Sequence, residues 1–282
     1  MGDKQRPGPT TRITAGEVRG GRLQRKPDTL VTEEPLEIRI EWPGHPPVSA
    51  AVAMRTPGAD FELAAGFLLS DGVIGVGTRP RTVAYCLEPS LQVDQLYNVV
   101  TVSLAEPPLR HPTPRTTAVS SACGVCGAQS LDAVFTPQDD PIPVEGRVDA
   151  TVIPTLPDRL LTRQSLFGRT GAIHAAGVFG MDGEVLLVRE DVGRHNAVDK
   201  VLGARVLGSA TFGHDVILCV SGRVGFDIIA KAVTGRVAVV VAVGGPSSLA
   251  VQLAERAGIT VCGFSRGDRF VVYTHPDRVH TG

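Results

Sequence analysis

The chain of 282 residues lacks several features that define special classes of protein. Its formal net charge is −1, so it has no basic excess for binding nucleic acid or an anionic membrane. Its longest apolar run, Val237 to Val243, is far shorter than the ~20 residues of a membrane-spanning helix. The N-terminus has no apolar signal segment, and five cysteines are too few, and odd in number, for a disulfide framework. These absences predict a cytoplasmic protein with neither a nucleic-acid nor a membrane partner.

The composition, with 43% hydrophobic and 20% charged residues, is typical of a globular protein. Basic residues concentrate at the N-terminus, where residues 1–30 hold seven Lys or Arg against three Asp or Glu. We expect residues 1–30 to form a disordered basic tail.

Residues 31–150 are predicted to form a smaller, β-rich domain. Val31–Ile40 alternates apolar and polar residues, and Val48–Met54 is a second strand that forms a hairpin with it. A helix is expected over Asp60–Leu69 and a strand over Asn98–Leu104. Five prolines within residues 136–158 indicate a linker, which places a soft domain boundary near residue 150.

Residues 151–282 alternate strand and helix patterns, which predicts an α/β domain with a mostly parallel sheet. Asp182-Gly183 marks a hairpin turn, and Ser247 or Ser248 is an expected N-cap. Strands and helices are expected over residues 177–179, 185–189, 196–207, 216–220, 226–233, 237–243, 249–257, 260–264 and 270–273.

Cys123-Gly-Val-Cys126 is the sharpest local motif. Two thiols on a Gly-rich loop before a helix can form a reactive thiolate, the nucleophile of redox and sulfur-transfer chemistry. Half of a zinc site, a thioredoxin-like redox pair, a persulfide carrier and an exposed pair without a role all stay open at this point. The remaining cysteines are single; Cys219 and Cys262 lie in apolar strand patterns and are expected in the core, and Cys86 has no assigned role.

Three polar loops follow predicted strands, where open α/β sheets bind ligands. They are Glu190–Asn196, Ser221–Arg223 and Phe264–Arg269, and none carries a dinucleotide or P-loop motif. His174 stands where a zinc deaminase has its motif histidine. Because Ala176 replaces the required glutamate, a deaminase-like backbone is possible but deaminase activity is not expected.

Taken together, the chain resembles the formate dehydrogenase accessory sulfurtransferase family. The resemblance spans residues 33–275 and rests on ordered motifs, which include Glu62-Leu-Ala-Ala-Gly-Phe-Leu, Ser121-Ala-Cys-Gly-Val-Cys-Gly, Gly171-Ala-Ile-His-Ala-Ala, Glu190-Asp-Val-Gly-Arg-His-Asn-Ala-Val-Asp-Lys, Ser221-Gly-Arg, Pro246-Ser-Ser-Leu-Ala-Val and Gly263-Phe-Ser-Arg-Gly.

The resemblance implies an α+β chain whose C-terminal half, residues 151–282, is a cytidine-deaminase-like three-layer domain. It implies a sulfurtransferase that takes persulfide sulfur from a cysteine desulfurase. That sulfur would pass to the bis-molybdopterin guanine dinucleotide form of the molybdenum cofactor, bound as cargo, for formate dehydrogenase. GDP is then an expected analogue of the cargo, and a homodimer stays open. The alternative is a non-catalytic cofactor chaperone with a structural or metal-binding CxxC.

The residues implied in catalysis are Cys123, with Cys126 as the second thiol, and no resident metal is expected. The resemblance assigns cofactor binding to Phe264, Ser265, Arg266, Gly267, Asp268 and Arg269. To these we add the polar residues of the neighbouring strand-end loops: His174, Arg194, His195, Ser221 and Arg223.

Overall fold

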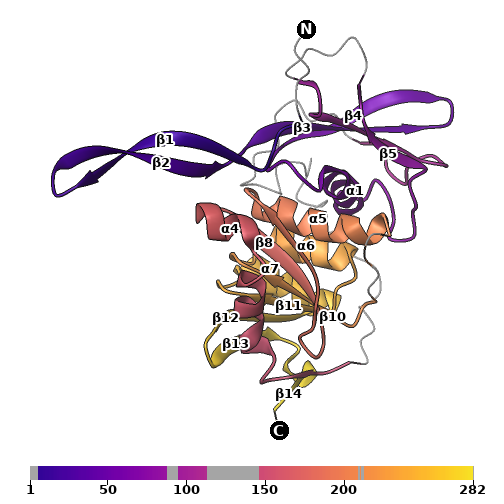
Figure 1. Cartoon of the computed structure of the whole chain (residues 1–282). Coiled ribbons are helices and arrows are strands. Elements are labelled where there is room, and N and C mark those ends of the chain that lie inside the picture. The colour runs from indigo at the N-terminus through magenta and orange to yellow at the C-terminus, as the bar shows by residue number, and fades with distance from the viewer. Residues whose placement is uncertain (1–5, 88–94, 113–145, 209, 211–212, 282) are drawn as a thin grey trace.

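The computed structural model describes residues 6–87, 95–112, 146–208, 210 and 213–281 (Figure 1). The motif cysteines Cys123 and Cys126 and the helix expected over residues 128–135 lie outside these ranges. Among the described residues, no helix is both long and apolar enough to cross a membrane.

The N-terminal part of the body is a four-stranded sheet with one helix across it. The strand order is β4-β3-β6-β5, and α1 lies against the sheet (Figure 1). The alternation read from the sequence buries Leu36, Ile38 and Ile40 on the helix side of β3, so the predicted hairpin is confirmed. The elements are β3 (Glu34–Trp42), β4 (His45–Arg55), α1 (Asp60–Ser70), β5 (Thr82–Tyr85) and β6 (Val99–Ser103).

The C-terminal part is built on a six-stranded sheet of order β13-β12-β11-β10-β8-β9. Only the β10–β11 and β11–β12 pairs are parallel; the other three pairs are antiparallel. The prediction of a mostly parallel sheet is therefore wrong: tight hairpins impose antiparallel pairing on β8–β9 and β12–β13, and β10 also pairs antiparallel with β8. The strands are β8 (His174–Gly180), β9 (Val185–Asp191), β10 (Val216–Val220), β11 (Val239–Ala242), β12 (Thr260–Arg266) and β13 (Arg269–Thr274).

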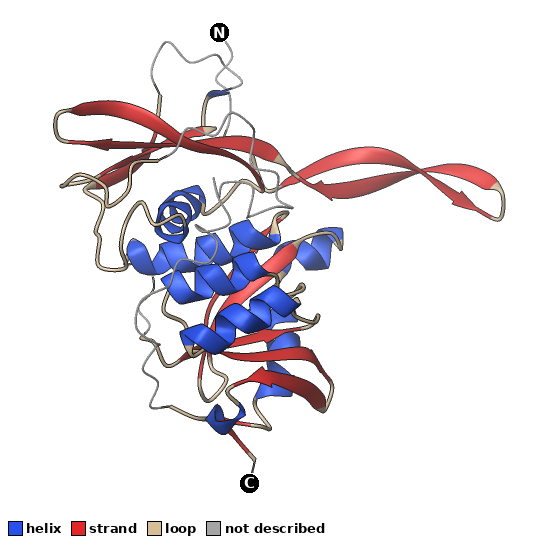
Figure 2. Ribbon diagram, turned by 180° about the vertical axis from the view of Figure 1, so that it is seen from behind, coloured by secondary structure: helices blue, strands red, loops and turns tan. Residues whose placement is uncertain are grey.

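Helices cover both faces of this sheet (Figure 2). On one face lie α5 (Arg194–Val206), α6 (Phe226–Thr234) and α7 (Ser248–Ala257), and the expected N-cap Ser247 accepts a hydrogen bond from the Ala250 N–H at 3.2 Å. Their core continues without a break into α1 and the four-stranded sheet. The α+β class is therefore confirmed, whereas the deaminase-like arrangement stays a prediction.

The opposite face is covered by a segment that the sequence analysis assigns to a linker. There lie β7 (Val148–Asp149), η2 (Ile153–Thr155) and α3 (Leu156–Leu161), with Ile153 and Leu156 fully buried. The linker prediction is wrong from Val148 onward, because prolines stand in the first turn of each short helix, where proline is tolerated. The remaining elements are α4 (Ser165–Thr170), η3 (Pro276–Arg278) and β14 (Val279–His280).

A two-stranded hairpin projects from this body as an arm (Figures 1 and 2). It consists of β1 (Thr10–Arg19) and β2 (Arg22–Val31), paired antiparallel along their whole length. Gly20 and Gly21, with φ of 57° and 77°, make the turn that a two-residue hairpin loop requires. The disordered-tail prediction is therefore wrong for these residues.

Candidate functional site

A cleft opens at the edge of the six-stranded sheet where β9, β10, β11 and β12 end and β8 begins. Its volume is about 540 Å³, the size of a small-molecule site. The sequence analysis predicts ligand binding at this edge, where the strands end. The cleft is lined by Pro157, Asp158, Leu160, Leu161, Gln164, Phe167, Gly171, Ala172, Ile173, His174, Val192, Ser221, Val243, Ser265 and Arg266.

Four of the expected binding residues line this cleft: His174, Ser221, Ser265 and Arg266. The two serine side chains are already engaged. Ser221 Oγ accepts the Ala175 N–H at 2.9 Å, and the buried Ser265 hydroxyl donates to the Ile153 carbonyl at 3.1 Å. These bonds fix the positions of the two serines, and Arg266 and His174 add a cation and an imidazole to the cleft.

His174 stands at the start of β8, half-buried beside Arg194 and Gly222. Burial lowers the pKa of His174, and the nearby Arg194 and His195 lower it further. The imidazole is therefore neutral at pH 7 and can accept one hydrogen bond and donate another. Asp158 is the acidic side chain among the lining residues, opposite in charge to Arg266.

The β12–β13 hairpin separates its residues between different surroundings. Arg266 lines the cleft, and its register partner Arg269 does not. Gly267 and Asp268 form the exposed turn between them. A Cβ on Gly245 would lie 2.5 Å from the Phe264 ring, so this ring packs on the neighbouring loop and does not line the cleft.

The other expected residues lie beside the cleft. Arg194 reaches Gly222 next to His174, whereas Arg223 is exposed and lies against Gly244. His195 is buried and its Nε2 lies 3.4 Å from Asp227 Oδ2, on the face of the sheet that α5, α6 and α7 cover. The structure thus brings Arg194 toward the cleft and turns His195 away from it.

The acidic loop Glu190–Asn196 is mainly a joint between the two parts of the body, which the sequence analysis missed. Asp191 is fully buried; it pairs with Lys200 Nζ at 2.7 Å and accepts the Thr56 N–H at 3.2 Å. Asn196 Nδ2 donates to the Met54 carbonyl at 2.7 Å. The sequence analysis assigned this loop to a ligand site because its charged residues follow a strand. No signal in the sequence showed that Asp191 and Asn196 instead bind Thr56 and Met54, which lie in β4 and the turn after it.

The apolar wall of the cleft was also missed, because it comes from α3, α4 and the segment after them. Glu190 holds α4 in place: its carboxylate accepts the Leu166 and Phe167 N–H groups at 2.9 and 2.8 Å. Leu160, Phe167 and Ile173 then face the ligand space. An apolar wall opposite an arginine and a neutral histidine suits a molecule with a flat ring and an anionic group.

Two of the described cysteines, Cys219 and Cys262, are poor nucleophiles. Cys219 and Cys262 are completely buried, which confirms them as core residues, and burial raises the pKa of Cys262 to about 12 and also raises that of Cys219. Cys86 is half-buried. Within the described ranges, no three His, Cys, Asp or Glu side chains are grouped so that they could hold a metal ion.

A mixed sheet with helices on both faces and a cleft of ligand size at its carboxyl edge defines the class: an α+β protein with a candidate ligand site at the sheet edge. Comparison with known proteins narrows this class to a family. The model of the FdhD/NarQ family matches residues 31–280, and the chain belongs to this family.

The relatives are similar over nearly their whole length. The sulfur carrier protein FdhD of Streptomyces coelicolor is 46% identical over 277 residues, 96% of this chain and 95% of the relative. The protein of the same name from Mycobacterium tuberculosis is 46% identical over 266 residues, 90% of this chain and 92% of the relative. A crystal structure from Desulfotalea psychrophila, provisionally described as a formate dehydrogenase accessory protein, shares the fold with a TM-score of 0.73 at 23% identity, covering 96% of this chain and 99% of that one.

Proposed function

We propose that this chain is a sulfur carrier. It takes persulfide sulfur from a cysteine desulfurase and delivers it to the bis-molybdopterin guanine dinucleotide molybdenum cofactor that formate dehydrogenase needs. The observation that carries the proposal is the 46% identity, along 96% of the chain, to a relative named as a sulfur carrier. The cytoplasm is the compartment in which we place the reaction.

The first step is thiol–persulfide exchange at Cys123. Its thiolate attacks the terminal sulfur of the desulfurase persulfide, a new S–S bond forms, and the desulfurase cysteine leaves as a thiolate. The product is a persulfide on Cys123. In the second step, Cys126 attacks the inner sulfur, hydrosulfide is released to molybdenum, and a Cys123–Cys126 disulfide remains for a thiol reductant to reopen.

The cleft is the proposed binding site for the guanine nucleotide end of the cargo. The apolar wall stacks with the base, and Arg266 pairs with phosphate oxygens. Neutral His174 supplies a hydrogen-bonding group at the same edge without adding charge. GDP, which contains the base and a diphosphate, is the simplest probe of this site.

Intact-mass spectrometry after incubation with a cysteine desulfurase and cysteine tests the carrier function. We expect a gain of about 32 Da, one sulfur atom, that a reductant removes. Cys123→Ala abolishes this gain, and the matched variant Cys86→Ala keeps it. A protein that gains no sulfur but retains a thiolate-bound metal would contradict the proposal and favour a cofactor-binding chaperone.

A further inference from the structure

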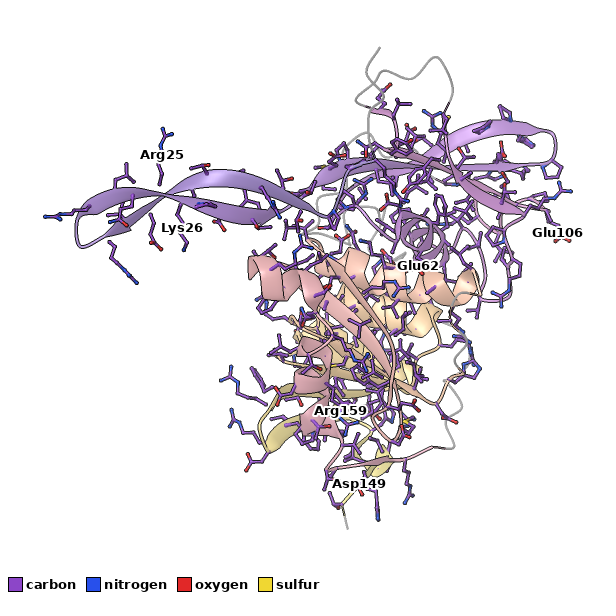
Figure 3. All side chains as sticks on the ribbon, viewed as in Figure 1. Arg25, Lys26, Glu62, Glu106, Asp149 and Arg159 are labelled. Atoms are coloured by element: carbon purple, nitrogen blue, oxygen red, sulfur yellow. The ribbon has the colours of Figure 1, made fainter. Side chains whose placement is uncertain are left out.

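The wall of the cleft formed by α3 and the turn after it contains two polar side chains whose partners lie outside the described chain. They are Asp158 in α3 and Gln164, which directly precedes α4. Arg159, the neighbour of Asp158 in α3, is labelled in Figure 3 in the C-terminal part of the body, apart from Glu62 of α1. Asp158 and Gln164 therefore belong to the cleft and not to the joint between the two parts of the body.

Gln164 is the stronger indication of a ligand. The residue is only 7% exposed, yet it lines the cleft. Its backbone is satisfied, because its N–H donates to the Leu161 carbonyl and its carbonyl accepts the Gly168 N–H, both at 3.1 Å. Among the described residues, no group forms a hydrogen bond with its side-chain amide. A buried amide costs free energy when it is left unpaired, so this one indicates a ligand group that pairs with it.

Asp158 supplies a second group of different chemistry. Its carboxylate makes no hydrogen bond or ion pair with any described residue. The neighbouring Arg159, by contrast, donates to the Gly183 carbonyl at 2.5 Å and does not line the cleft. A carboxylate only accepts hydrogen bonds, whereas an amide both donates and accepts them. The α3 wall thus offers two acceptor oxygens at one position and a donor with an acceptor at the other.

The charges of the cleft orient an anionic ligand. Arg266 lies at the sheet edge and Asp158 lies in the α3 wall, and both line the cleft. Phosphate groups are attracted to Arg266 and repelled by Asp158. The ring of a nucleotide therefore faces α3, where Leu161 and Phe167 add apolar surface.

The ring edge that matches Asp158 and Gln164 has two adjacent N–H donors and a carbonyl. This is the 2-amino-4-oxopyrimidine edge, whose ring N–H and exocyclic amine bond the two oxygens of a carboxylate, while its carbonyl accepts from an amide. Guanine has this edge, and so does the pterin ring of molybdopterin. Adenine does not, because it presents an unprotonated ring nitrogen that would face the carboxylate with a second acceptor.

We propose that Asp158 and Gln164 read the 2-amino-4-oxopyrimidine edge of the ligand. Asp158 accepts from the ring N–H and the amine, and Gln164 donates to the carbonyl. The inference rests on the proposed function, because it takes the molybdenum cofactor as the occupant of the cleft. It adds the two residues that select this ring over other bases.

Titration calorimetry of the full chain with four nucleoside diphosphates, at fixed salt and pH, tests the proposal. GDP has the whole edge, IDP lacks the amine, XDP has a carbonyl in place of the amine, and ADP lacks the ring N–H. We expect the wild type to bind GDP at least about tenfold more tightly than the other three, because each of them leaves a carboxylate oxygen unpaired.

Asp158→Asn should reverse the preference between GDP and XDP. The new amide N–H donates to the xanthine carbonyl but opposes the guanine amine, so GDP binding weakens at least about tenfold and XDP binding strengthens. Asp182→Asn is the matched control. It makes the same change at an exposed carboxylate in the β8–β9 turn, at the end of β8 opposite to His174, and both affinities should stay within about twofold.

Gln164→Leu separates recognition from a structural role. We expect it to weaken GDP, IDP and XDP alike, by about three- to tenfold, because these three share the carbonyl, and to leave ADP unchanged. Circular dichroism checks that each variant folds. Equal weakening of ADP would show that Gln164 only shapes the cleft, which overturns its proposed role.

The remaining outcomes distinguish this proposal from the proposed function. A wild type that binds GDP without preference, or an unchanged ratio of GDP to XDP affinity in Asp158→Asn, overturns the reading edge and leaves the nucleotide in the cleft. Neopterin, which has the edge without a phosphate, is the probe for the pterin end. Binding of neopterin but not GDP, weakened by Asp158→Asn, supports the reading edge and overturns the placement of the nucleotide. Binding of neither probe overturns both.

Discussion

At the scale of single residues, the β12–β13 hairpin contains a matched pair of arginines. Arg266 and Arg269 oppose each other in the ladder, yet only Arg266 lines the cleft. We expect Arg266→Ala to weaken GDP binding about tenfold or more, because a charged hydrogen bond is worth ~1.5–3 kcal/mol. Arg269→Ala should stay within about twofold, a difference that calorimetry at fixed salt resolves.

The comparison of these two variants locates the nucleotide. Equal weakening by both would place the phosphates outside the cleft, at the hairpin turn. Unchanged affinity in both would move the site to Arg194 and Arg223 at the neighbouring loops. The proposed persulfide loading of Cys123 serves as the control, because neither arginine variant changes that residue.

His174 gives the cleft a pH dependence whose sign follows from its surroundings. Its folded-state pKa lies below the ordinary histidine value of about 6.5, mainly because of burial. Between those two pKa values the unfolded chain binds more protons than the folded chain, so stability falls as pH drops below about 6.5. We expect His174→Asn, which cannot titrate, to show a shallower fall in urea denaturation across this range.

The difference between wild type and variant is the quantity to measure, since other histidines also titrate. Parallel curves for the two proteins would show that His174 is not the group responsible. GDP affinity gives a second readout. Protonation of His174 adds a positive charge to the cleft, so wild-type affinity should rise as the pH falls, and the variant should lack this rise.

At the scale of elements, the crossing of α1 and α5 depends on two glycines. A Cβ on Gly66 would lie 1.8 Å from the Asp199 carbonyl oxygen, and one on Gly203 would lie 1.7 Å from that of Glu62. The backbones of α1 and α5 are therefore in direct contact at these two positions, and any side chain larger than that of glycine would force the helices apart. Glu62 also pairs with Arg189 of β9 at 2.7 Å, so α1 is tied to the sheet beyond α5.

Gly66→Ala should therefore lower the free energy of unfolding by more than about 2 kcal/mol, because the helices must separate to admit the methyl group. Gly168→Ala in α4 is the control. A Cβ there meets nothing within 4 Å, and alanine favours a helix over glycine by up to ~1 kcal/mol. Chemical denaturation measures both. A tolerated Gly66→Ala would mean that the crossing is loose.

Elements with strong periodicity were predictable from the sequence, and those defined by long-range contacts were not. Leu36, Ile38 and Ile40 alternate along β3, and Ser247 caps α7 as expected. The arm was missed because charge outweighed the Gly20-Gly21 turn signal. The cover formed by η2 and α3 was missed because prolines at a helix start resemble those of a linker.

The candidate site was predictable where it depends on strand ends. His174, Ser221 and Arg266 meet because the sheet brings the ends of β9 to β12 and the start of β8 to one edge. The role of Asp191 was not predictable. Its partners Thr56 and Lys200 lie on different elements, and Thr56 is 135 residues away in the sequence. Only the folded chain brings the three residues together.

At the scale of the whole molecule, the two parts of the body are joined by a shared core and by hydrogen bonds from a buried ion pair of one part to the backbone of the other. One apolar cluster runs from β3 through α1 and α5 to α7. Within this joint, the buried Lys200 pairs with Asp191 and donates to the Thr56 carbonyl at 2.9 Å. A second buried pair, Arg55 and Asp60 at 3.0 Å, lies at the neighbouring turn. Neither part can unfold without exposing these groups.

Lys200→Met should therefore lower the unfolding free energy by ~3–5 kcal/mol, because it leaves the Asp191 carboxylate buried without its cation. Lys26→Met is the control: it removes an ion pair whose side chains are 60% and 46% exposed, and such pairs contribute ~0–1 kcal/mol.

Trp42, the single tryptophan, reports unfolding of the four-stranded sheet by fluorescence, while circular dichroism reports mainly α5, α6 and α7. Because the core is continuous, the two signals should change at the same denaturant concentration in the wild type and shift together in Lys200→Met. If Trp42 instead unfolded first in the wild type, the two parts would be separate cooperative units, and the buried joint would position the cleft without holding the fold together.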